Sequence, residues 1–242
     1  MIRIDPLGSR SSELARSGDC IVLPPALAAP SYLQAIAETM PASVDVFGVC
    51  SPGRGALADL PPHSDVEELV QTLRAFMASR ARPTVLLGHS LGALHALAVA
   101  ADDALRSDGT VVAVVVAAAD PPGSPVRHVT PESLIRVAGL EEFDAPGMVG
   151  DHLRALAASD LAVARTLRRM LSRAHVDYPI EVFLGADDRH VDAEEANGWG
   201  RHSLSCRITT LPGGHDFVTA RSNAAAISAS VLTHLLTVRT TA

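Results

Sequence analysis

Residues 84–100 have the sequence TVLLGHSLGALHALAVA. Residues 84–87 form a short, mostly apolar run that is typical of a buried strand, and the alanine- and leucine-rich stretch from Leu91 predicts a helix. Between them, Gly88–His89–Ser90–Leu91–Gly92 matches the pattern G-x-S-x-G. In such a tight turn the glycines let neighbouring backbone approach, so the serine hydroxyl projects above the sheet. Ser90 is therefore the candidate nucleophile.

Further short apolar runs occur on both sides of this unit and alternate with helical patterns. Runs of this kind are typical of parallel strands that are covered by helices on both faces. The expected strands are residues 21–23, 44–49, 84–87, 111–116, 180–184 and 207–211. Because strands and helices alternate, the sequence predicts the α/β class, with a mostly parallel central sheet.

The expected helices include a long insertion. Ser64–Asp65–Val66–Glu67 has the pattern of a capping box and opens a helix with apolar residues at helical spacing. A second helix is expected at residues 91–101, and a last one runs from after Asp216 to Leu236. Residues 121–178 contain no credible strand, only helical pieces, which predicts a helical lid insertion within a single domain of residues 1–242.

Composition limits the possible functions. A chain of 242 residues, 48% of them hydrophobic, can bury one large core, and a net charge of −7 argues against nucleic acid as a partner. The longest apolar run, residues 111–119, is about half of the ~20 residues that a membrane helix needs. Residues 1–18 lack the features of a signal peptide, and Cys20, Cys50 and Cys206 lack metal or disulfide spacing. We therefore expect a cytoplasmic monomer without metal, cofactor or membrane partner.

A serine nucleophile needs a general base. Gly213–Gly214–His215–Asp216–Phe217 follows the last expected strand and precedes the last helix, so it places a histidine in a glycine-rich loop. The other histidines show no convincing ligand spacing. His215 is the predicted base.

The base in turn needs an acid that holds its tautomer. Asp187 and Asp188 follow the expected strand 180–184, in a loop where an α/β sheet presents its functional side chains. We favour Asp188 as the acid. The alternative is that both aspartates form only a turn and the cap of a helix beginning near Asp192.

The oxyanion formed during acyl transfer needs backbone N–H donors, one of them from the residue after the nucleophile. Leu91 supplies that donor. A second is expected from the early loop, where Pro24 and Pro25 have no N–H, so Ala26 is the first possible donor and Leu27 the next. We predict Ala26.

The order Ser, Asp, His along the chain is that of the α/β-hydrolase fold. With these motifs the chain resembles the type II thioesterases, the stand-alone editing hydrolases associated with polyketide synthases and non-ribosomal peptide synthetases. The resemblance covers nearly the whole chain and rests on Pro52–Gly53–Arg54–Gly55, the G-x-S-x-G motif with Ala93, the helical insertion, the Asp188 loop with Trp199 beyond it, and the glycine-rich loop around His215.

The resemblance implies a function and site residues. It implies hydrolysis of acyl groups from the phosphopantetheine arm of an acyl or peptidyl carrier protein, as in antibiotic biosynthesis. Ser90, Asp188 and His215 fall on the family's triad positions, and Ala26 and Leu91 on its oxyanion donors. The same triad could serve an acyltransferase, a cyclase or a carboxylesterase, and a non-catalytic binding protein could keep the fold.

Two features bear on the substrate. The family usually has histidine or tyrosine, alanine and two glycines in the early loop, where this chain has Pro25–Ala26–Leu27–Ala28. This stiffer, bulkier loop could narrow the acyl entrance or shift the donor. Arg165, Arg168, Arg169 and Arg173 cluster in one predicted helix, where they could receive an acidic carrier protein or form a solvated face.

Overall fold

The computed structural model describes residues 1–8, 17–63, 65–102, 110–124 and 129–239. These residues form a seven-stranded sheet with the strand order β1-β3-β2-β4-β5-β6-β7. The strands are β1 (Arg3–Pro6), β2 (Gly18–Leu23), β3 (Val44–Cys50), β4 (Thr84–His89), β5 (Val111–Ala117), β6 (Ile180–Gly185) and β7 (Cys206–Leu211). All neighbouring strands are parallel except β1 and β3, so the predicted α/β class with a mostly parallel sheet is confirmed.

The six predicted strands are all present, and β1 is the strand that the sequence did not predict. It has only four residues, none of them buried, and pairs antiparallel with β3 at the edge of the sheet. A short, half-exposed edge strand has no continuous apolar run, because only one of its sides is covered.

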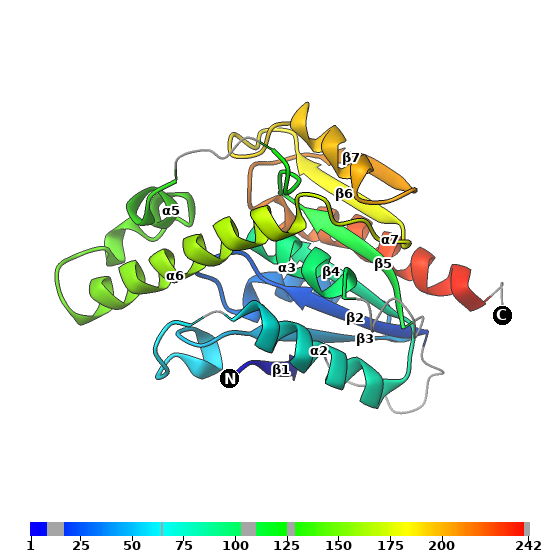
Figure 1. The fold of residues 1–242 in the computed structure, drawn as a ribbon, viewed down its shortest axis with the longest axis horizontal. Coiled ribbons are helices and arrows are strands. Elements are labelled where there is room, and N and C mark those ends of the chain that lie inside the picture. Colours follow the sequence, from blue (N-terminus) through cyan, green and yellow to red (C-terminus); the bar gives the residue numbers. More distant parts are fainter. Residues whose placement is uncertain (9–16, 64, 103–109, 125–128, 240–242) are drawn as a thin grey trace.

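Helices cover both faces of the sheet (Figure 1). Within the described residues, the α-helices are α1 (Gln34–Thr39), α2 (Val66–Arg80), α3 (Leu91–Ala100), α5 (Pro131–Val137), α6 (Met148–Leu171) and α7 (Arg221–Arg239), with short 3-10 turns η1 (Pro30–Leu33), η2 (Gly55–Leu57), η3 (Glu141–Phe143), η4 (Glu195–Arg201) and η5 (Phe217–Thr219). Helices α2, α3 and α6 pack on one face, and α1 and α7 pack on the other. The two apolar layers explain why the central strands are buried on both sides.

The start of α2 corrects one detail of the prediction. Its N-cap is Asp65, whose Oδ1 accepts hydrogen bonds from the backbone N–H of Glu67 and Glu68 at 2.9 and 3.3 Å. The predicted capping box began at Ser64, which lies outside the described residues. Aspartate caps a helix as well as serine does and also places negative charge at the positive end of the helix dipole.

The predicted helical insertion lies between β5 and β6 and contains α5, η3 and α6. Helix α6 is one continuous helix of 24 residues rather than separate pieces, and it extends beyond the edge of the sheet in Figure 1. Leu153 and Leu156 of α6 form a small apolar cluster with Ile135 of α5 and Leu27 of the loop after β2. The insertion therefore packs directly on the loop in which the oxyanion donor was predicted. None of the described helices is long and apolar enough to cross a membrane.

Candidate active site

Ser90 occupies a strained turn between β4 and α3. Its backbone has φ 53° and ψ −115°, an unusual conformation for a residue other than glycine, and its N–H donates to the carbonyl of Ala117 at 2.8 Å. A Cβ on Gly88 would lie 2.1 Å from the carbonyl oxygen of Gly92, and one on Gly92 would lie 2.0 Å from that of Leu23. Both glycines of the motif are thus required by close backbone approach.

His215 and Asp188 come together from the loops that follow β7 and β6. The imidazole Nδ1 lies 2.9 Å from Oδ2 of Asp188, whose side chain is 2% exposed, against 19% for His215. Oδ1 of Asp188 accepts the backbone N–H of His190 at 2.8 Å. With Nδ1 held by the carboxylate, Nε2 is the ring nitrogen left for proton transfer.

The neighbouring Asp187 lies differently. Its side chain is exposed, and its backbone N–H donates to the carbonyl of Gly213 at 2.9 Å. The structure therefore brings Asp188, and not Asp187, to the imidazole of His215. The sequence also allowed Asp187 and Asp188 to cap a helix that begins near Asp192. The structure has the 3-10 turn η4 there, and it is the carboxylate of Asp192 that accepts hydrogen bonds from the N–H groups of Glu194 and Glu195 at its start.

Opposing effects act on the carboxyl group of Asp188. Burial raises its pKa, but the hydrogen bond with His215, the charge of His215, the N–H of His190 and the charge of His190 lower it. The net result is a pKa below the ordinary value of an aspartate. Asp188 is therefore a carboxylate at neutral pH and can stabilise an imidazolium at His215.

His89 contacts the loop that carries His215. It is fully buried, its ring contacts those of Tyr32 and His215, and its Nε2 lies 2.8 Å from the carbonyl oxygen of His215. Burial, together with the nearby His215, lowers its pKa to about 3. His89 is thus neutral and donates its Nε2–H to that carbonyl. In the sequence His89 stands out only as part of the motif, because the residue that it contacts lies 126 positions further along the chain.

The early loop is held by a buried ion pair that the sequence did not reveal. The backbone N–H of Leu27 donates to Oδ2 of Asp160 on α6 at 2.7 Å. The guanidinium of Arg54 donates to the two oxygens of the same carboxylate at 3.0 and 2.6 Å, and both side chains are buried, 7% and 1% exposed. The amide of Leu27 is therefore already occupied, which leaves Ala26 as the first candidate donor of this loop.

Two cavities meet at Ser90. The larger, of 770 Å³, is lined by the early loop, Tyr32, α5 with the residues after it, and the loops of Asp187 and His215. The smaller, of 220 Å³, is lined by α3, the loop after β5 and α6. Both cavities share Ala26, Ser90, Leu134, Val137, His190 and His215.

All five predicted site residues thus belong to one region. Ser90, His215 and Ala26 line both cavities, Leu91 lines the smaller one, and Asp188 lies against His215. Within the described ranges, no group of three His, Cys, Asp or Glu side chains could hold a metal ion. The arrangement offers a hydroxyl, an imidazole with an ionised partner and backbone N–H groups, which are the components of nucleophilic acyl transfer.

Comparison with known proteins gives the family. The family model "Thioesterase domain" matches residues 20–235. Among curated proteins, the AMB antimetabolite synthetase AmbE of Pseudomonas aeruginosa is 29% identical over 238 residues; the match covers 90% of this chain and 11% of AmbE. The chain thus spans about a ninth of the length of that relative.

Solved structures share the fold over almost the whole chain. The type II thioesterase BorB from the borrelidin biosynthetic cluster has a TM-score of 0.74 at 25% identity, with 96% of this chain and 97% of BorB covered. RedJ, a thioesterase of the prodiginine pathway in Streptomyces coelicolor, has a TM-score of 0.74 at 23% identity, with 91% and 86% covered. The family match spans most of the sheet and both loops that carry Asp188 and His215. The chain therefore belongs to the thioesterase domain family and is a thioester hydrolase of the serine-hydrolase class.

Proposed function

We propose that this thioesterase hydrolyses acyl groups from the phosphopantetheine arm of an acyl or peptidyl carrier protein, in polyketide or non-ribosomal peptide biosynthesis. The observation that carries the proposal is the hydrogen bond between His215 and Asp188 beside cavities that Ser90 also lines, in a chain of the thioesterase domain family. Its likeness to BorB, a type II thioesterase of a biosynthetic cluster, supports the carrier-bound substrate.

In the first half of the reaction, Oγ of Ser90 attacks the thioester carbonyl while Nε2 of His215 takes the hydroxyl proton. The carbonyl oxygen gains the negative charge and accepts hydrogen bonds from the N–H groups of Leu91 and Ala26. The carbon–sulfur bond then breaks, and the arm leaves as a thiol after proton transfer from the imidazolium of His215. Asp188 stabilises that imidazolium and keeps its Nδ1 protonated.

In the second half, water attacks the acyl group on Ser90. Nε2 of His215 takes a proton from the water, and the same N–H groups bind the second oxyanion. Collapse of this intermediate returns the proton to Oγ of Ser90 and releases a carboxylic acid. If an alcohol or an amine replaced the water, the product would be an ester, a macrocycle or an amide, so the test has to identify the product.

The proposal is tested by following a panel of acyl groups on a carrier protein by mass spectrometry, beside the same groups on a short pantetheine mimic. We expect free carboxylic acid as the product, faster release from the carrier protein, and no release by the Ser90→Ala variant. Intact thioesters with the wild-type chain, or equal release by Ser90→Ala, would overturn the proposal. Equal rates on the mimic and on free carboxylic esters would favour a carboxylesterase instead.

A further inference from the structure

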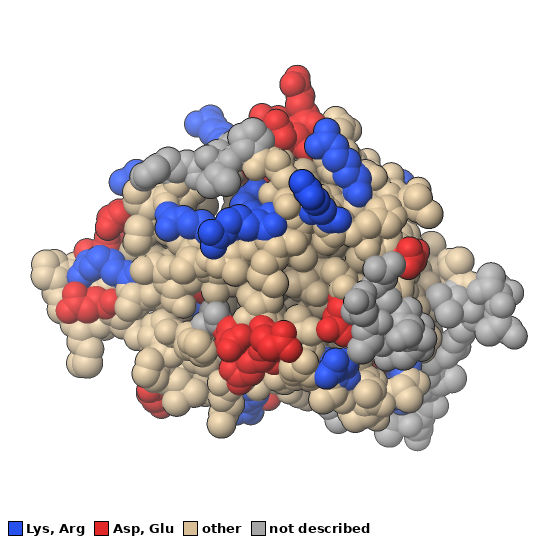
Figure 2. Space-filling view, viewed as in Figure 1, with Lys and Arg blue, Asp and Glu red and all other residues tan. Residues whose placement is uncertain are grey.

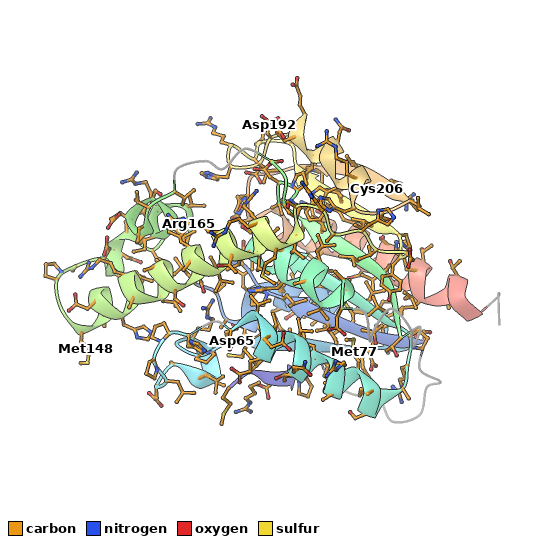
Figure 3. The ribbon with its side chains drawn as sticks, in the orientation of Figure 1. Asp65, Met77, Met148, Arg165, Asp192 and Cys206 are labelled. Carbon is orange, nitrogen blue, oxygen red and sulfur yellow. The ribbon has the colours of Figure 1, made fainter. Side chains whose placement is uncertain are left out.

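A basic groove runs along the second half of α6. Arg165, Arg168 and Arg169 line a surface hollow of 550 Å³ together with Ser172 and with Pro122 and Gly123 of the loop after β5. Arg165 and Arg169 are exposed, and residues 161–171 contain no acidic side chain. Basic side chains gather over this half of α6 in Figure 2, and Figure 3 labels Arg165 among them. Of the four arginines predicted to form a cluster, Arg173 is not part of the lining.

The groove continues into the active site through one side chain. Arg168 lines the groove and also the 220 Å³ cavity that contains Ser90 and His215. Three successive turns of α6 line that cavity, the first through Asp160 and Leu161, the next through Ala164 and the last through Arg168. At 1.5 Å per residue, Asp160 and Arg168 are about 12 Å apart along the helix axis. The smaller cavity therefore extends along α6 from Asp160, which binds the early loop, to Arg168 of the groove.

We propose that this groove binds the phosphate of the phosphopantetheine arm, so that the arm enters through the smaller cavity and the acyl group occupies the larger one. The inference rests on the proposed function and deepens it. The phosphate is at the opposite end of the arm from the thioester sulfur, so it should bind at the rim of the site and not beside Ser90. Guanidinium groups bind phosphate oxygens through paired N–H donors.

Backbone contacts hold two of these arginines beside the groove. Arg168 donates to the carbonyl of Pro121 at 3.3 Å, and Arg165 donates to that of Val129 at 3.4 Å. The bond of Arg165 is long and its acceptor is neutral, so it does not cancel the charge of this guanidinium. Such contacts keep the side chains near the groove and reduce the entropy that they lose on binding.

The helix dipole alone does not explain the arginines. Cations in the last turn of a helix are favourable, which accounts for Arg168 and Arg169. Arg165 lies one turn earlier, and the dipole gives no reason for Arg168 to line the catalytic cavity as well. The acidic side chains of Glu194 and Glu195 line a separate, adjacent hollow with Arg201 and are not part of the lining of the groove. Glu195 accepts a hydrogen bond from Ser124 there. In a chain with a net charge of −7, the groove is a local basic site.

The test compares two thioesters that carry the same acyl group, one on phosphopantetheine and one on pantetheine. For the wild-type chain we expect kcat/KM to be about 10-fold higher with the phosphate present, as for one or two hydrogen bonds to a charged group. In the double variant Arg165→Gln/Arg169→Gln this preference should disappear, while the activity on acyl-pantetheine stays unchanged. The preference of the wild type should also shrink as salt concentration rises.

A matched control replaces two exposed arginines on other elements, Arg136 of α5 and Arg221 of α7, by glutamine. This control should keep the full preference for phosphate. Equal kcat/KM of the wild type on both thioesters, or an unchanged preference in Arg165→Gln/Arg169→Gln, would overturn the phosphate site.

A binding measurement separates this inference from the function on which it rests. Calorimetry with the Ser90→Ala variant compares free phosphopantetheine with pantetheine. Ser90-dependent hydrolysis of both thioesters without any phosphate preference would overturn the groove and leave the function standing. Phosphate-dependent binding without hydrolysis by the wild type would overturn the function and leave the groove standing.

Discussion

At the scale of single residues, two adjacent aspartates offer a direct test of the site. The carboxylate of Asp188 is buried against His215, whereas that of Asp187 is exposed. The substitution Asp188→Asn would present either an amide N–H or a neutral oxygen to Nδ1, so both the negative charge and the control of the tautomer would be lost. We expect this variant to lower kcat by about 10³- to 10⁴-fold, as in other serine hydrolases, with little change in KM.

Asp187→Asn is the matched control, because it makes the same chemical change one residue away. Its kcat should stay within a few-fold of the wild type in the same steady-state assay with a short thioester. Similar losses in both variants would mean that the loop as a whole, and not the carboxylate of Asp188, is needed. A loss in Asp187→Asn alone would reverse the assignment.

The sequence predicted the site residues that lie in local patterns. Ser90 and His215 stand in glycine-rich turns whose spacing from strand and helix is visible in the sequence, and Ala26 follows from the missing N–H groups of two prolines. The contact of Leu27 with Asp160 joins residues 133 positions apart and has no such pattern. This contact depends on how α6 packs over the sheet, and no local pattern of residues in the sequence predicts that packing.

At the scale of elements, α6 and the early loop are joined through the carboxylate of Asp160. Leu27 has φ 66°, a left-handed conformation that disfavours leucine and favours glycine. This is the loop in which the chain lacks the glycine pair of the resembled family. The hydrogen bond to Asp160 and the apolar cluster with Ile135, Leu153 and Leu156 hold Leu27 in this conformation. The insertion thus contacts Leu27 where the resembled family usually has glycine.

Breaking this connection should destabilise the chain and lower its activity. Removing one partner of a buried ion pair leaves the other charge unpaired, at a typical cost of about 3–5 kcal/mol. We expect Asp160→Ala and Arg54→Ala each to lose stability of this order in urea unfolding. The double variant should lose less than the sum of the two, because neither charge is then left alone.

The activity of Asp160→Asn shows whether the carboxylate also positions the early loop. Asparagine keeps the volume and one acceptor, so we expect a folded chain whose kcat falls more than its KM changes. An added Leu27→Gly substitution should restore part of kcat, because glycine adopts positive φ without the hydrogen bond. A normal kcat in Asp160→Asn would contradict a positioning role. Stability losses that simply add in the double variant of Asp160 and Arg54 would contradict the ion pair between them.

Elements differed in how well the sequence predicted them. The six buried strands were found because strands covered on both faces are continuously apolar. The short edge strand β1 and the small helix α1 were not found, since neither is long enough to show a period. Helix α6 was predicted in pieces because its polar and small residues interrupt the apolar pattern, although packing on α3 and α5 keeps it continuous.

At the scale of the whole molecule, the site lies at the carboxyl ends of the parallel strands. Ala26, Ser90, Asp188 and His215 follow β2, β4, β6 and β7, so each lies beyond the carboxyl end of a parallel strand. Residues far apart in the sequence meet there because all these strands point the same way. The insertion between β5 and β6 extends beyond the sheet (Figure 1). It adds residues of α5 and α6 to the lining of the site, and α6 carries the arginines of the groove.

The same burial that builds this site should make the molecule sensitive to acid. Burial lowers the pKa of His89 to about 3, and burial lowers that of His95 to about 4 even though nearby Asp160 raises it. In the unfolded chain both histidines bind protons below about pH 6.5. As the pH falls from about 6.5 towards 4, the unfolded state therefore takes up two protons that the folded state does not, so folding stability decreases. Each histidine contributes a slope of about 1.4 kcal/mol per pH unit in this window.

Urea unfolding between pH 7 and pH 4.5 measures this slope directly. His95→Gln should lose about half of the histidine contribution, because glutamine does not titrate, whereas His63→Gln, at an exposed position, should leave the slope unchanged. The carboxylates of Asp188 and Glu181, whose pKa values are lowered in the fold, add a further loss only as the pH falls below their ordinary values near 4. A free energy of unfolding that stays constant from pH 6.5 to pH 4.5 would mean that His89 and His95 become protonated within the folded protein. The assignment of His89 as a neutral imidazole that donates to the carbonyl of His215 would then be wrong.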